Sequence, residues 1–231
     1  MAKIKIIDIG AANYEQDERW NFQRHDVETI LFEPDERSYL DLKSKGYEAY
    51  NFALGSKTGI QSLNLTRKPQ CSSFLTPNIE LLQRYPEKER WDIVGTVNVN
   101  VRDLDSFTLD ADFIKLDTQG SELEVLVGAA NTLNETLGLE IEVSFIEIYK
   151  GQPLFGDVCR YLAEAGFELF DFITEYRYGR QELNRKGQLS FADALFLKTP
   201  ETVSNMSKDK IDKYITIVNA YGKNDLANCL T

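Results

Sequence analysis

The chain has 231 residues, enough for one sizeable domain, and its 42% hydrophobic and 27% charged residues are ordinary for a folded protein. Its formal net charge of −11 argues against nucleic-acid binding, which requires lysine and arginine gathered on one face. No apolar run is long enough to span a membrane, so we expect no membrane span. No secretory-signal pattern opens the chain and the three cysteines lie far apart, so we expect a cytoplasmic protein with reduced thiols.

Strand-like runs and helix-like patterns alternate along most of the chain. Runs rich in Ile, Val, Leu, Phe and Tyr that end in Gly, Pro or acidic residues predict strands at 3–10, 28–35, 47–55, 112–119 and 138–146. Amphipathic patterns predict helices at 36–46, 76–86, 121–133 and 153–166. Strands separated by helices indicate a parallel sheet with helices on both faces.

Capping residues mark several of these helices. Asp35 is a good N-cap for the first, and Thr76 followed by Pro77 is expected to begin the second, which Pro86 ends. Glu122 suits the positive amino end of the third. The apolar residues of the third helix fall on one face, which we expect to be buried: Leu123, Leu126, Val127, Ala130 and Leu133.

The end of the chain has a different pattern. Residues 167–173 and 191–198 read as strands separated by a polar segment without a helical period, which predicts an antiparallel pair closing the sheet. Beyond them, Ile211, Tyr214, Ile215 and Val218 share one face of a predicted C-terminal helix. We expect this helix to pack on the core, and no linker marks a second full domain.

The motif DIGAAN, residues 8–13, directly follows the first strand. Small residues at a strand end let the backbone approach a ligand closely, as in dinucleotide-binding turns. The glycine pattern is incomplete, because Ala12 and Gln16 stand where further glycines often occur. A plain tight loop therefore explains the motif as well as a cofactor turn does.

Glu33 follows the second strand in LFEPD, 23 residues after Gly10. An acid at this place can accept both hydroxyl hydrogens of an adenosine ribose, although an acid facing solvent at the strand exit is the simpler reading. Its position before Pro34, combined with DIGAAN, favours a cofactor that contains adenosine.

Charged residues interrupt two of the predicted strands. Lys115 and Asp117 share one face of the strand in FIKLDTQGSE, and Glu140 and Glu142 share one face of the next strand, LEIEVSF. Since an unpaired lysine in a parallel sheet costs several kcal/mol, Lys115 is expected to pair with Glu142, with Glu140 as the second choice. A structural ion pair and a functional pair both agree with this pattern.

Taken together, these segments resemble the FkbM family of S-adenosylmethionine-dependent O-methyltransferases. The matching pieces, between about residues 4 and 198, are DIGAAN, LFEPD, FALGS, CSSF, RDLDSF, DFIKLDTQGSELEVLVGA and LEIEVSF. The resemblance implies a class I methyltransferase fold of the α/β type, a Rossmann-like three-layer sandwich with a seven-stranded, mostly parallel sheet and an antiparallel last strand. It also implies a methyltransferase domain at 1–200, followed by a C-terminal helical extension at 201–231 packed on the core.

The resemblance assigns S-adenosylmethionine as the cofactor and implies where it binds. The first turn would lie near the methionine part, Glu33 would bind the ribose hydroxyls, and the end of the third strand would flank the adenine. Asp117, after the fourth strand, would face the region of methyl transfer. The full set expected at the cofactor is Asp8, Gly10, Ala11, Ala12, Asn13, Glu33, Pro34, Phe52, Ala53, Leu54 and Asp117. Many members have Glu where this chain has Gln119, so we assign no base role there.

Methyl transfer to a hydroxyl requires an aligned acceptor and a group that takes its proton. His25, the only histidine, lies in the polar run NFQRHD, so neither a zinc site nor a Ser-His-Asp triad is expected. Carboxylates are the remaining bases. We favour Asp117, because ligands bind at the carboxyl ends of strands in open sheets, with Lys115 holding a carboxylate or stabilising developing charge.

Other candidates are less specific. Glu122 and Glu142 are further catalytic candidates, although Glu122 also suits a helix start without any function. Ser72 and Ser73 could contact the acceptor, and ordinary loop serines explain them equally well. The carboxylates could hold a divalent cation, but no spacing indicates one.

The leading hypothesis is an O-methyltransferase that acts on a hydroxyl of a sugar, glycan precursor or small natural product. One alternative is a nicotinamide-dependent oxidoreductase, because a turn with a ribose-binding acid also serves that cofactor. Another is a non-catalytic binding module that retains the fold. The sequence identifies neither the acceptor nor the oligomeric state.

Overall fold

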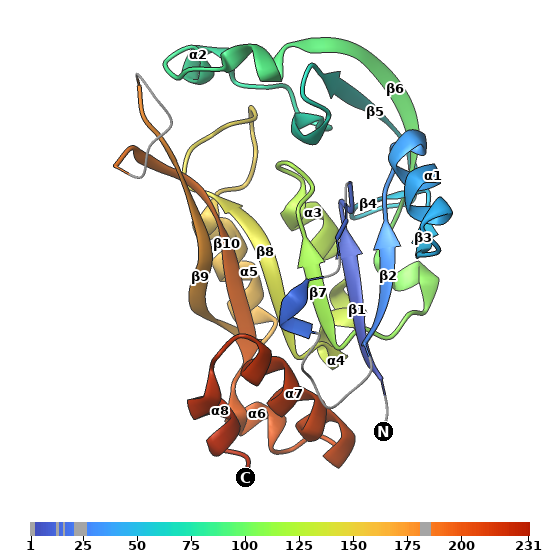
Figure 1. The fold of residues 1–231 in the computed structure, drawn as a ribbon, viewed down its shortest axis with the longest axis vertical. Coiled ribbons are helices and arrows are strands. Elements are labelled where there is room, and N and C mark those ends of the chain that lie inside the picture. The colour runs from blue at the N-terminus through green and yellow to red at the C-terminus, as the bar shows by residue number, and fades with distance from the viewer. Residues whose placement is uncertain (1–2, 13, 16, 21–26, 181–185) are drawn as a thin grey trace.

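The computed structural model describes residues 3–12, 14–15, 17–20, 27–180 and 186–231 (Figure 1). Asn13, expected at the cofactor, and His25 lie outside the described residues. The core of the described chain is a seven-stranded sheet in the order β3-β2-β1-β7-β8-β10-β9. Its strands are β3 (Glu48–Tyr50), β2 (Val27–Phe32), β1 (Ile4–Ile9), β7 (Phe113–Leu116), β8 (Gly138–Ser144), β10 (Gln188–Lys198) and β9 (Phe167–Tyr178).

The strand directions confirm the expected fold class. Strands β3, β2, β1, β7 and β8 pair in parallel, whereas β10 runs antiparallel to both of its neighbours, β8 and β9. The predicted antiparallel pair at the end of the chain is therefore confirmed as β9 and β10, with β10 inserted between β8 and β9. The result is an α/β fold with a mostly parallel sheet and an antiparallel last strand.

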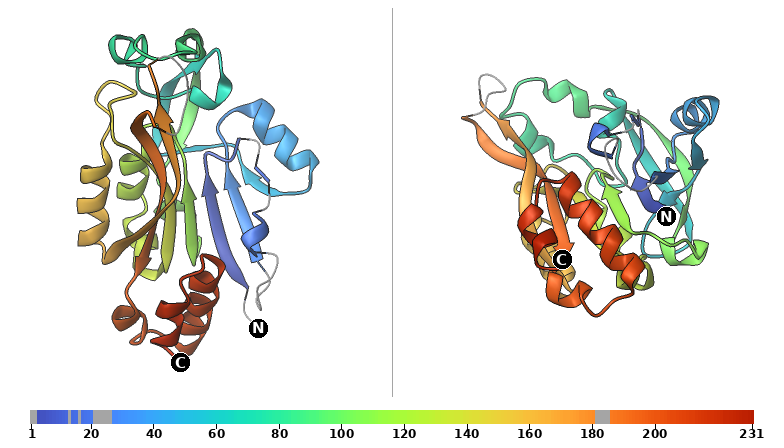
Figure 2. Two further views of the ribbon diagram at one scale, coloured as in Figure 1. Left: turned by 60° about the vertical axis from the view of Figure 1, so that its left-hand side comes forward. Right: turned by 60° about the horizontal axis from the view of Figure 1, so that its bottom comes forward.

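One face of this sheet is apolar and covered by helices. Alternate residues of the strands, among them Ile7, Ile9 and Leu116, pack against α3 (Glu122–Val127), α4 (Ala130–Glu135) and α5 (Phe155–Glu164). Figure 2 shows these helices together on one side of the sheet. Burial of this face supplies the largest hydrophobic cluster of the described residues.

The opposite face has two kinds of cover. Helix α1 (Glu36–Ser44), capped by Asp35 as predicted, packs Leu42 on Leu31 of β2. Three C-terminal helices, α6 (Pro200–Val203), α7 (Lys208–Ala220) and α8 (Asn224–Asn228), pack on the end of the sheet where β1 and β7 begin, below the strands in Figure 1. The predicted docking of the C-terminal helix is confirmed by Tyr214 and Val218, which are fully buried. The domain boundary at residue 200 stays a prediction.

A second sheet of three strands lies above the carboxyl ends of the parallel strands (Figures 1 and 2). It has the order β4-β6-β5 and consists of β4 (Ala53–Leu54), β6 (Ile93–Arg102) and β5 (Gly59–Thr66). We predicted one strand at 47–55, but the chain forms two: β3 joins the large sheet and β4 joins the small one. The sequence interpretation missed β5 and β6. Many of their apolar residues are exposed, including Ile60 and Val94, although β6 alternates valine with polar residues from Val97 onwards.

Two helix predictions were wrong in detail. The helix expected at 121–133 is broken into α3 and α4 at Gly128, where a Cβ atom would lie only 2.0 Å from the carbonyl oxygen of Gly55. The buried stripe is also not the expected one: Val127 is 44% exposed and Ala130 is exposed, while Val125 and Ala129 are buried.

The second helix also begins later than expected. Helix α2 (Ile79–Leu82) is capped by Asn78, whose side chain accepts a hydrogen bond from the amide of Leu81. Thr76 is not the cap, because its carbonyl accepts the amide of Lys150 and Pro77 forms a β-bridge with Tyr149. None of the helices that the structure describes is long and apolar enough to cross a membrane.

Candidate functional site

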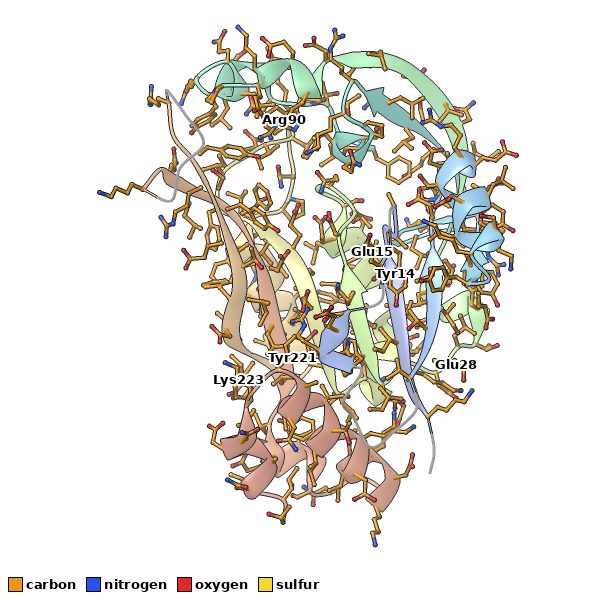
Figure 3. The ribbon with its side chains drawn as sticks, viewed as in Figure 1. Tyr14, Glu15, Glu28, Arg90, Tyr221 and Lys223 are labelled. Carbon is orange, nitrogen blue, oxygen red and sulfur yellow. The ribbon has the colours of Figure 1, made fainter. Side chains whose placement is uncertain are left out.

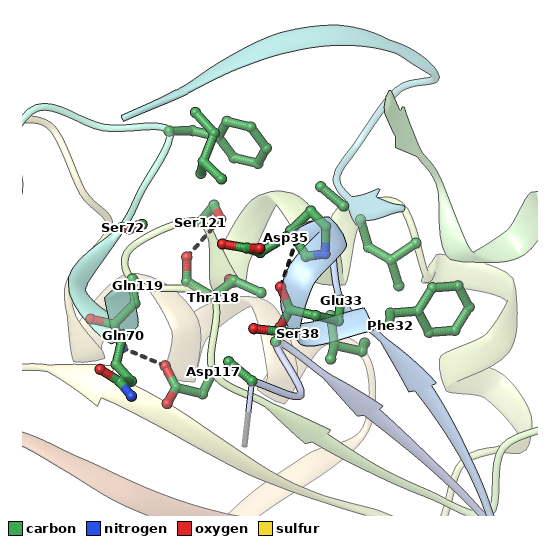
Figure 4. Close-up of a pocket in the computed structure, with 18 of the residues that line it drawn as sticks. Phe32, Glu33, Asp35, Ser38, Gln70, Ser72, Asp117, Thr118, Gln119 and Ser121 are labelled. Carbon is green, nitrogen blue, oxygen red and sulfur yellow. Dashed lines mark hydrogen bonds between the residues drawn. The ribbon is translucent and has the colours of Figure 1, made fainter. Parts of the chain in front are cut away.

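A cavity opens where the carboxyl ends of β1, β2 and β7 meet beneath the small sheet (Figure 4). We call it the strand-end cavity. Its lining comes from the turn after β1, the segment after β2, the start of β4 and the turn after β7, and also from β5 and the segment 69–74 of the small-sheet region. The predicted cofactor residues among its lining are Gly10, Ala12, Glu33, Pro34, Phe52, Ala53, Leu54 and Asp117.

The turn after β1 has a backbone that only glycine fits. Gly10 has a φ of +85°, and a Cβ atom there would lie 1.8 Å from the carbonyl oxygen of Asp117. The amides of Gly10 and Ala11 both donate to the carbonyl of Phe32, at 3.0 and 3.2 Å. The single glycine of DIGAAN therefore brings the ends of β1, β2 and β7 together. Ala11 itself is buried against α1 and β2, outside the strand-end cavity.

Glu33 is buried at the end of β2, with only 4% of its surface exposed. Its Oε1 accepts the amide of Asp35 at 2.7 Å, and no described residue donates a hydrogen bond to Oε2. Burial raises the pKa of Glu33 to about 7. A buried carboxylate with one unused oxygen, facing a cavity, fits the hydroxyl groups of a ribose. Phe52 and Leu54 provide apolar surface beside it.

The turn after β7 collects polar groups around Gln119. This residue has a φ of +56°, in the left-handed region that residues with a side chain seldom adopt. Its amide nitrogen donates to Asp117 Oδ1 at 2.6 Å and to Glu142 Oε1 at 3.3 Å, and its amide oxygen accepts the hydroxyl of Tyr149 at 3.0 Å. Figure 4 shows the contact between Gln119 and Asp117. The side chain of Gln119 thus fixes Asp117 relative to Glu142.

The carboxyls of this turn resist ionisation. Asp117 meets solvent inside the cleft, but the protein around the cleft desolvates its carboxyl and raises the pKa. The pKa of Glu142 is raised well above its ordinary value, first by burial and then by the nearby Asp117. Two carboxyls in one site cannot both ionise easily, so the pair binds a proton more tightly than either group would alone.

Glu122 is buried at the amino end of α3 and is bonded to the turn. Its carboxylate accepts the amide of Gly120 at 3.0 Å and the amide of Thr118 at 2.9 Å. It does not line the strand-end cavity. Carboxylate oxygens of Asp117, Glu122 and Glu142 lie within 4.8 Å of one another, which is close enough to share a metal ion. In the structure, Gln119 donates to one oxygen each of Asp117 and Glu142, and backbone amides of the turn donate to Glu122.

We expect the stability of the protein to fall as the pH rises from about 4.5 to about 7. Burial raises the pKa of Glu122 from 4.5 to about 7, so the folded state holds a proton that the unfolded state has lost in this window. The contribution to stability is complete below the unfolded pKa and is lost as the pH rises through the folded value. Urea unfolding between pH 5 and pH 8 should show a smaller slope for Glu122→Gln than for the wild type.

The exposed Glu124, two residues after Glu122 on α3, supplies the control for this prediction. Glu124→Gln should keep the wild-type dependence of unfolding free energy on pH. An identical slope in the wild type and in Glu122→Gln would show that Glu122 does not bind the proton in question.

Lys115 pairs with Glu140, so the predicted pairing with Glu142 was wrong. The distance from Lys115 Nζ to Glu140 Oε1 is 3.6 Å. The reason is the parallel register of β7 and β8, which places Lys115 directly opposite Glu140, two residues before Glu142. Arg19 also contacts Glu140, at 2.9 Å, and the hydroxyl of Tyr221 donates to it at 2.7 Å. Figure 3 shows Tyr221 reaching this face from the C-terminal helices.

The remaining predicted residues lie at the border of the site. Asp8 and Ala11 line a second cavity that shares Gly10, Ala12 and Asp117 with the first. Ser72 lines the strand-end cavity, and its Oγ accepts the amide of Thr66 at 3.1 Å. Ser73 is buried and donates to the carbonyl of Gln119 at 2.7 Å, which supports the strained turn.

Sequence reasoning did not identify several residues of the site. Tyr149, which holds Gln119, belongs to a segment far along the chain, and only its place in a buried aromatic cluster reveals it. The small sheet contributes the apolar Leu63 and Leu65 to the cavity. Both leucines lie on β5, which the sequence interpretation missed. Their alternation with polar residues in SLNLT is the signal that could have identified them.

Comparisons with solved structures show weak similarity to several methyltransferases. One is the magnesium protoporphyrin IX methyltransferase ChlM from Synechocystis PCC 6803 with bound SAM, at 8% identity and a TM-score of 0.44, covering 85% of this chain and 71% of that chain. Another is precorrin-6y C5,15-methyltransferase from Geobacter metallireducens GS-15, at 10% identity and a TM-score of 0.44, covering 85% and 81%. A TehB-like SAM-dependent methyltransferase from Corynebacterium glutamicum has 12% identity and a TM-score of 0.40, covering 86% and 83%.

The family comparison is more informative. No curated protein sequence matches the chain. The model of the methyltransferase FkbM domain matches residues 8–169, which is more than half of the chain and includes the turn after β1, Glu33 and the turn after β7. This match confirms the resemblance seen in the sequence and, with it, S-adenosylmethionine as the cofactor. The chain belongs to the FkbM methyltransferase family.

Proposed function

We propose that the protein transfers a methyl group to a hydroxyl of a sugar, a glycan precursor or a small natural product. The observation that carries this proposal is the position of Asp117, which lies at the carboxyl end of β7, lines the strand-end cavity and has a raised pKa. S-adenosylmethionine supplies an activated methyl group on a sulfonium, so the protein must align the acceptor and receive its proton.

The residues of the strand-end cavity fit this cofactor. We propose that the unused oxygen of Glu33 accepts the ribose hydroxyls, that Phe52, Ala53 and Leu54 flank the adenine, and that Gly10, Ala12 and Pro34 allow close contact. Asn13, outside the described residues, is retained as a further cofactor residue on the resemblance alone.

Asp117 is the proposed general base. A hydroxyl acceptor has a pKa far above 7, and a carboxylate whose pKa is shifted toward neutrality accepts its proton better than an ordinary one. Gln119 occupies Oδ1 of Asp117, which leaves Oδ2 for the acceptor. We propose that Glu142 shares a proton with Asp117. Lys115 would stabilise negative charge that develops beside Asp117, and Glu122 would position the turn. Ser72 would meet the acceptor, and Ser73 would support Gln119 from behind.

Three free cysteines support the proposal that the protein works in the cytoplasm.

The family assignment favours methyl transfer over the nicotinamide-dependent alternative. We propose further that residues 201–231 form a helical extension to a methyltransferase domain at 1–200, since α6–α8 pack on the sheet outside the residues that the family model matches.

The proposed function is tested by incubating the protein with S-adenosylmethionine and a panel of hydroxylated sugars and natural products. Formation of S-adenosylhomocysteine together with a methyl ether in the product, located by NMR, is the expected result. A methyl group found on nitrogen or carbon would contradict O-methylation. Stabilisation by NAD, without stabilisation by either S-adenosyl compound, would instead support the oxidoreductase.

The affinity for S-adenosylhomocysteine is expected to rise about tenfold between pH 6 and pH 8. Glu33 has a pKa of about 7 in the free protein, and hydroxyl donors bind its ionised form better than its protonated form. Calorimetric titration of Glu33→Gln should give weaker binding with little change over this range. Glu36→Gln, at the exposed start of α1, is the matched control and should keep the dependence of the wild type. A pH-independent affinity in the wild type would rule out Glu33 as the ribose ligand.

A further inference from the structure

The second cavity, of about 290 Å³, lies on the opposite face of the sheet from α3, α4 and α5 and adjoins the strand-end cavity through Gly10, Ala12 and Asp117. We call it the acidic cavity. Its lining includes six carboxylates, which come from β1, the loop after it, the turn after β7, β8 and β10: Asp8, Glu15, Asp117, Glu140, Glu142 and Asp193.

The strand register builds this concentration of charge. Asp8, Lys115 and Glu140 are consecutive partners across β1, β7 and β8, and Glu142 is the partner of Asp193 across β8 and β10. Side chains of paired residues project from the same face, so these groups stand side by side. Nearer the start of β1 and β7, the same face is apolar and covered by the C-terminal helices. The acidic cavity is therefore the stretch of this face beyond those helices, toward the carboxyl ends of β1 and β7.

Positive charge compensates only one part of the acidic cavity. Lys115 and Arg19 both contact Glu140. Among residues 3–12, 14–15, 17–20, 27–180 and 186–231, none of the other five carboxylates of the cavity forms an ion pair. Negative charges gathered in one cavity repel one another, and a bound cation would relieve this repulsion.

Asp8 gives a second and independent sign of a ligand. Protein encloses its carboxyl except where it faces the cavity, and no described residue donates a hydrogen bond to it. A half-buried carboxylate that no described residue satisfies is free to accept a hydrogen bond or a cation from a group that enters the cavity. Burial raises its pKa to about 6, which leaves it mostly ionised at neutral pH.

The far end of the acidic cavity is formed by Asp193 and Tyr176. The hydroxyl of Tyr176 contacts Asp193 Oδ2 at 3.4 Å, and its ring stacks on Phe191 at 4.3 Å between centroids, which fixes the ring in place. A carboxylate beside a fixed aromatic ring is a suitable site for an ammonium group, which gains both charge pairing and cation–π attraction.

We propose that the methyl acceptor carries a protonated amine, which binds at Asp193 and Tyr176 while its hydroxyl faces Asp117. This inference rests on the proposed function and deepens it, because it names the acceptor class as an amino sugar or another amino alcohol. If the methionine part of the cofactor binds near the first turn, as the family resemblance implies, Asp8 would be the carboxylate next to its charged groups. Asp193 lies three strands away, across β7 and β8, and remains for a cation on the acceptor.

The test compares two sugars of nearly the same size, glucosamine, which carries an ammonium group, and glucose, which has a neutral hydroxyl at the same carbon, binding to the protein saturated with S-adenosylhomocysteine. Calorimetric titration should show glucosamine binding at least about tenfold more tightly, as expected for one desolvated charge pair. Asp193→Asn should abolish this preference and leave the affinity for S-adenosylhomocysteine unchanged. Glu175→Gln, on β9 but paired with Arg177 outside the cavity, is the matched control and should retain the preference.

Each other outcome would overturn the proposal. Equal affinity for the two sugars, no binding of either, or a preference that survives Asp193→Asn would show that the cavity does not select an amine. Binding of Mg²⁺ that is lost in Asp193→Asn would make the cavity a metal site instead. Loss of S-adenosylhomocysteine binding in the wild type would refute the proposed function itself, so the two failures are distinguishable.

Discussion

Replacing Asp117 by asparagine is expected to slow methyl transfer by a factor of about 10² to 10⁴ while leaving the affinity for S-adenosylhomocysteine nearly unchanged. Asparagine keeps the shape of the side chain and its contact with Gln119, but it cannot take a proton from the acceptor. The measurement is the rate of S-adenosylhomocysteine release with an acceptor first selected on the wild-type protein.

The pH profile separates a base from a residue that only positions the acceptor. If Asp117 is the base, the wild-type rate should rise with pH through its raised pKa, and this rise should disappear in Asp117→Asn. Asp110→Asn, at an exposed acid that pairs with Lys5, is the control and should keep both rate and profile. Full activity in Asp117→Asn would remove Asp117 from the mechanism.

Replacing Gly10 by alanine is expected to destabilise the protein by at least about 3 kcal/mol. Two penalties combine at this position. The φ of +85° disfavours any residue with a Cβ atom, and that atom would lie 1.8 Å from the carbonyl oxygen of Asp117, so the ends of β1 and β7 must separate. Urea unfolding measures the loss, and binding of S-adenosylhomocysteine should weaken with it because the same turn lines the cavity.

Gly46 offers a matched control for this change. It has a φ of +86°, almost the same as that of Gly10, but a Cβ atom there would meet nothing within 4 Å. Gly46→Ala should therefore cost only about 1 kcal/mol, which is the penalty of the backbone conformation alone. Equal costs at the two glycines would show that the close approach to Asp117 contributes nothing.

The parallel part of the sheet was predictable because each of its main strands is visible in the sequence as a run of apolar residues. β1, β7, β8 and the second half of β2 are mostly buried on both faces, and such strands read as apolar runs with clear ends. The small sheet could not be read in the same way. Its strand β5 has four exposed residues in succession at its start, and its pairing with β6 spans a long segment with no local signal.

The residues of the site were predictable where a short motif at the end of a predicted strand contains them, as for Gly10 in DIGAAN and Glu33 in LFEPD. It was not predictable where a contact depends on register. The expectation that Lys115 meets Glu142 used the correct strands and the correct face, but the pairing of β7 with β8 was offset by two residues from the one assumed. The role of Tyr149 depends on tertiary packing alone, since 30 residues separate it from Gln119.

The placement of β10 between β8 and β9 bears on how the chain can fold during synthesis. β8 cannot complete its backbone hydrogen bonds on that side until residues 188–198 have left the ribosome, because β10 alone pairs with it there. Until then, the nascent sheet ends in an unpaired apolar edge strand, which is a template for association with other chains. A fragment that stopped at residue 169, where the family model ends, would keep that edge permanently. The acidic cavity would also lack Asp193, so the segment after residue 169 is required both to close the sheet and to complete its polar face.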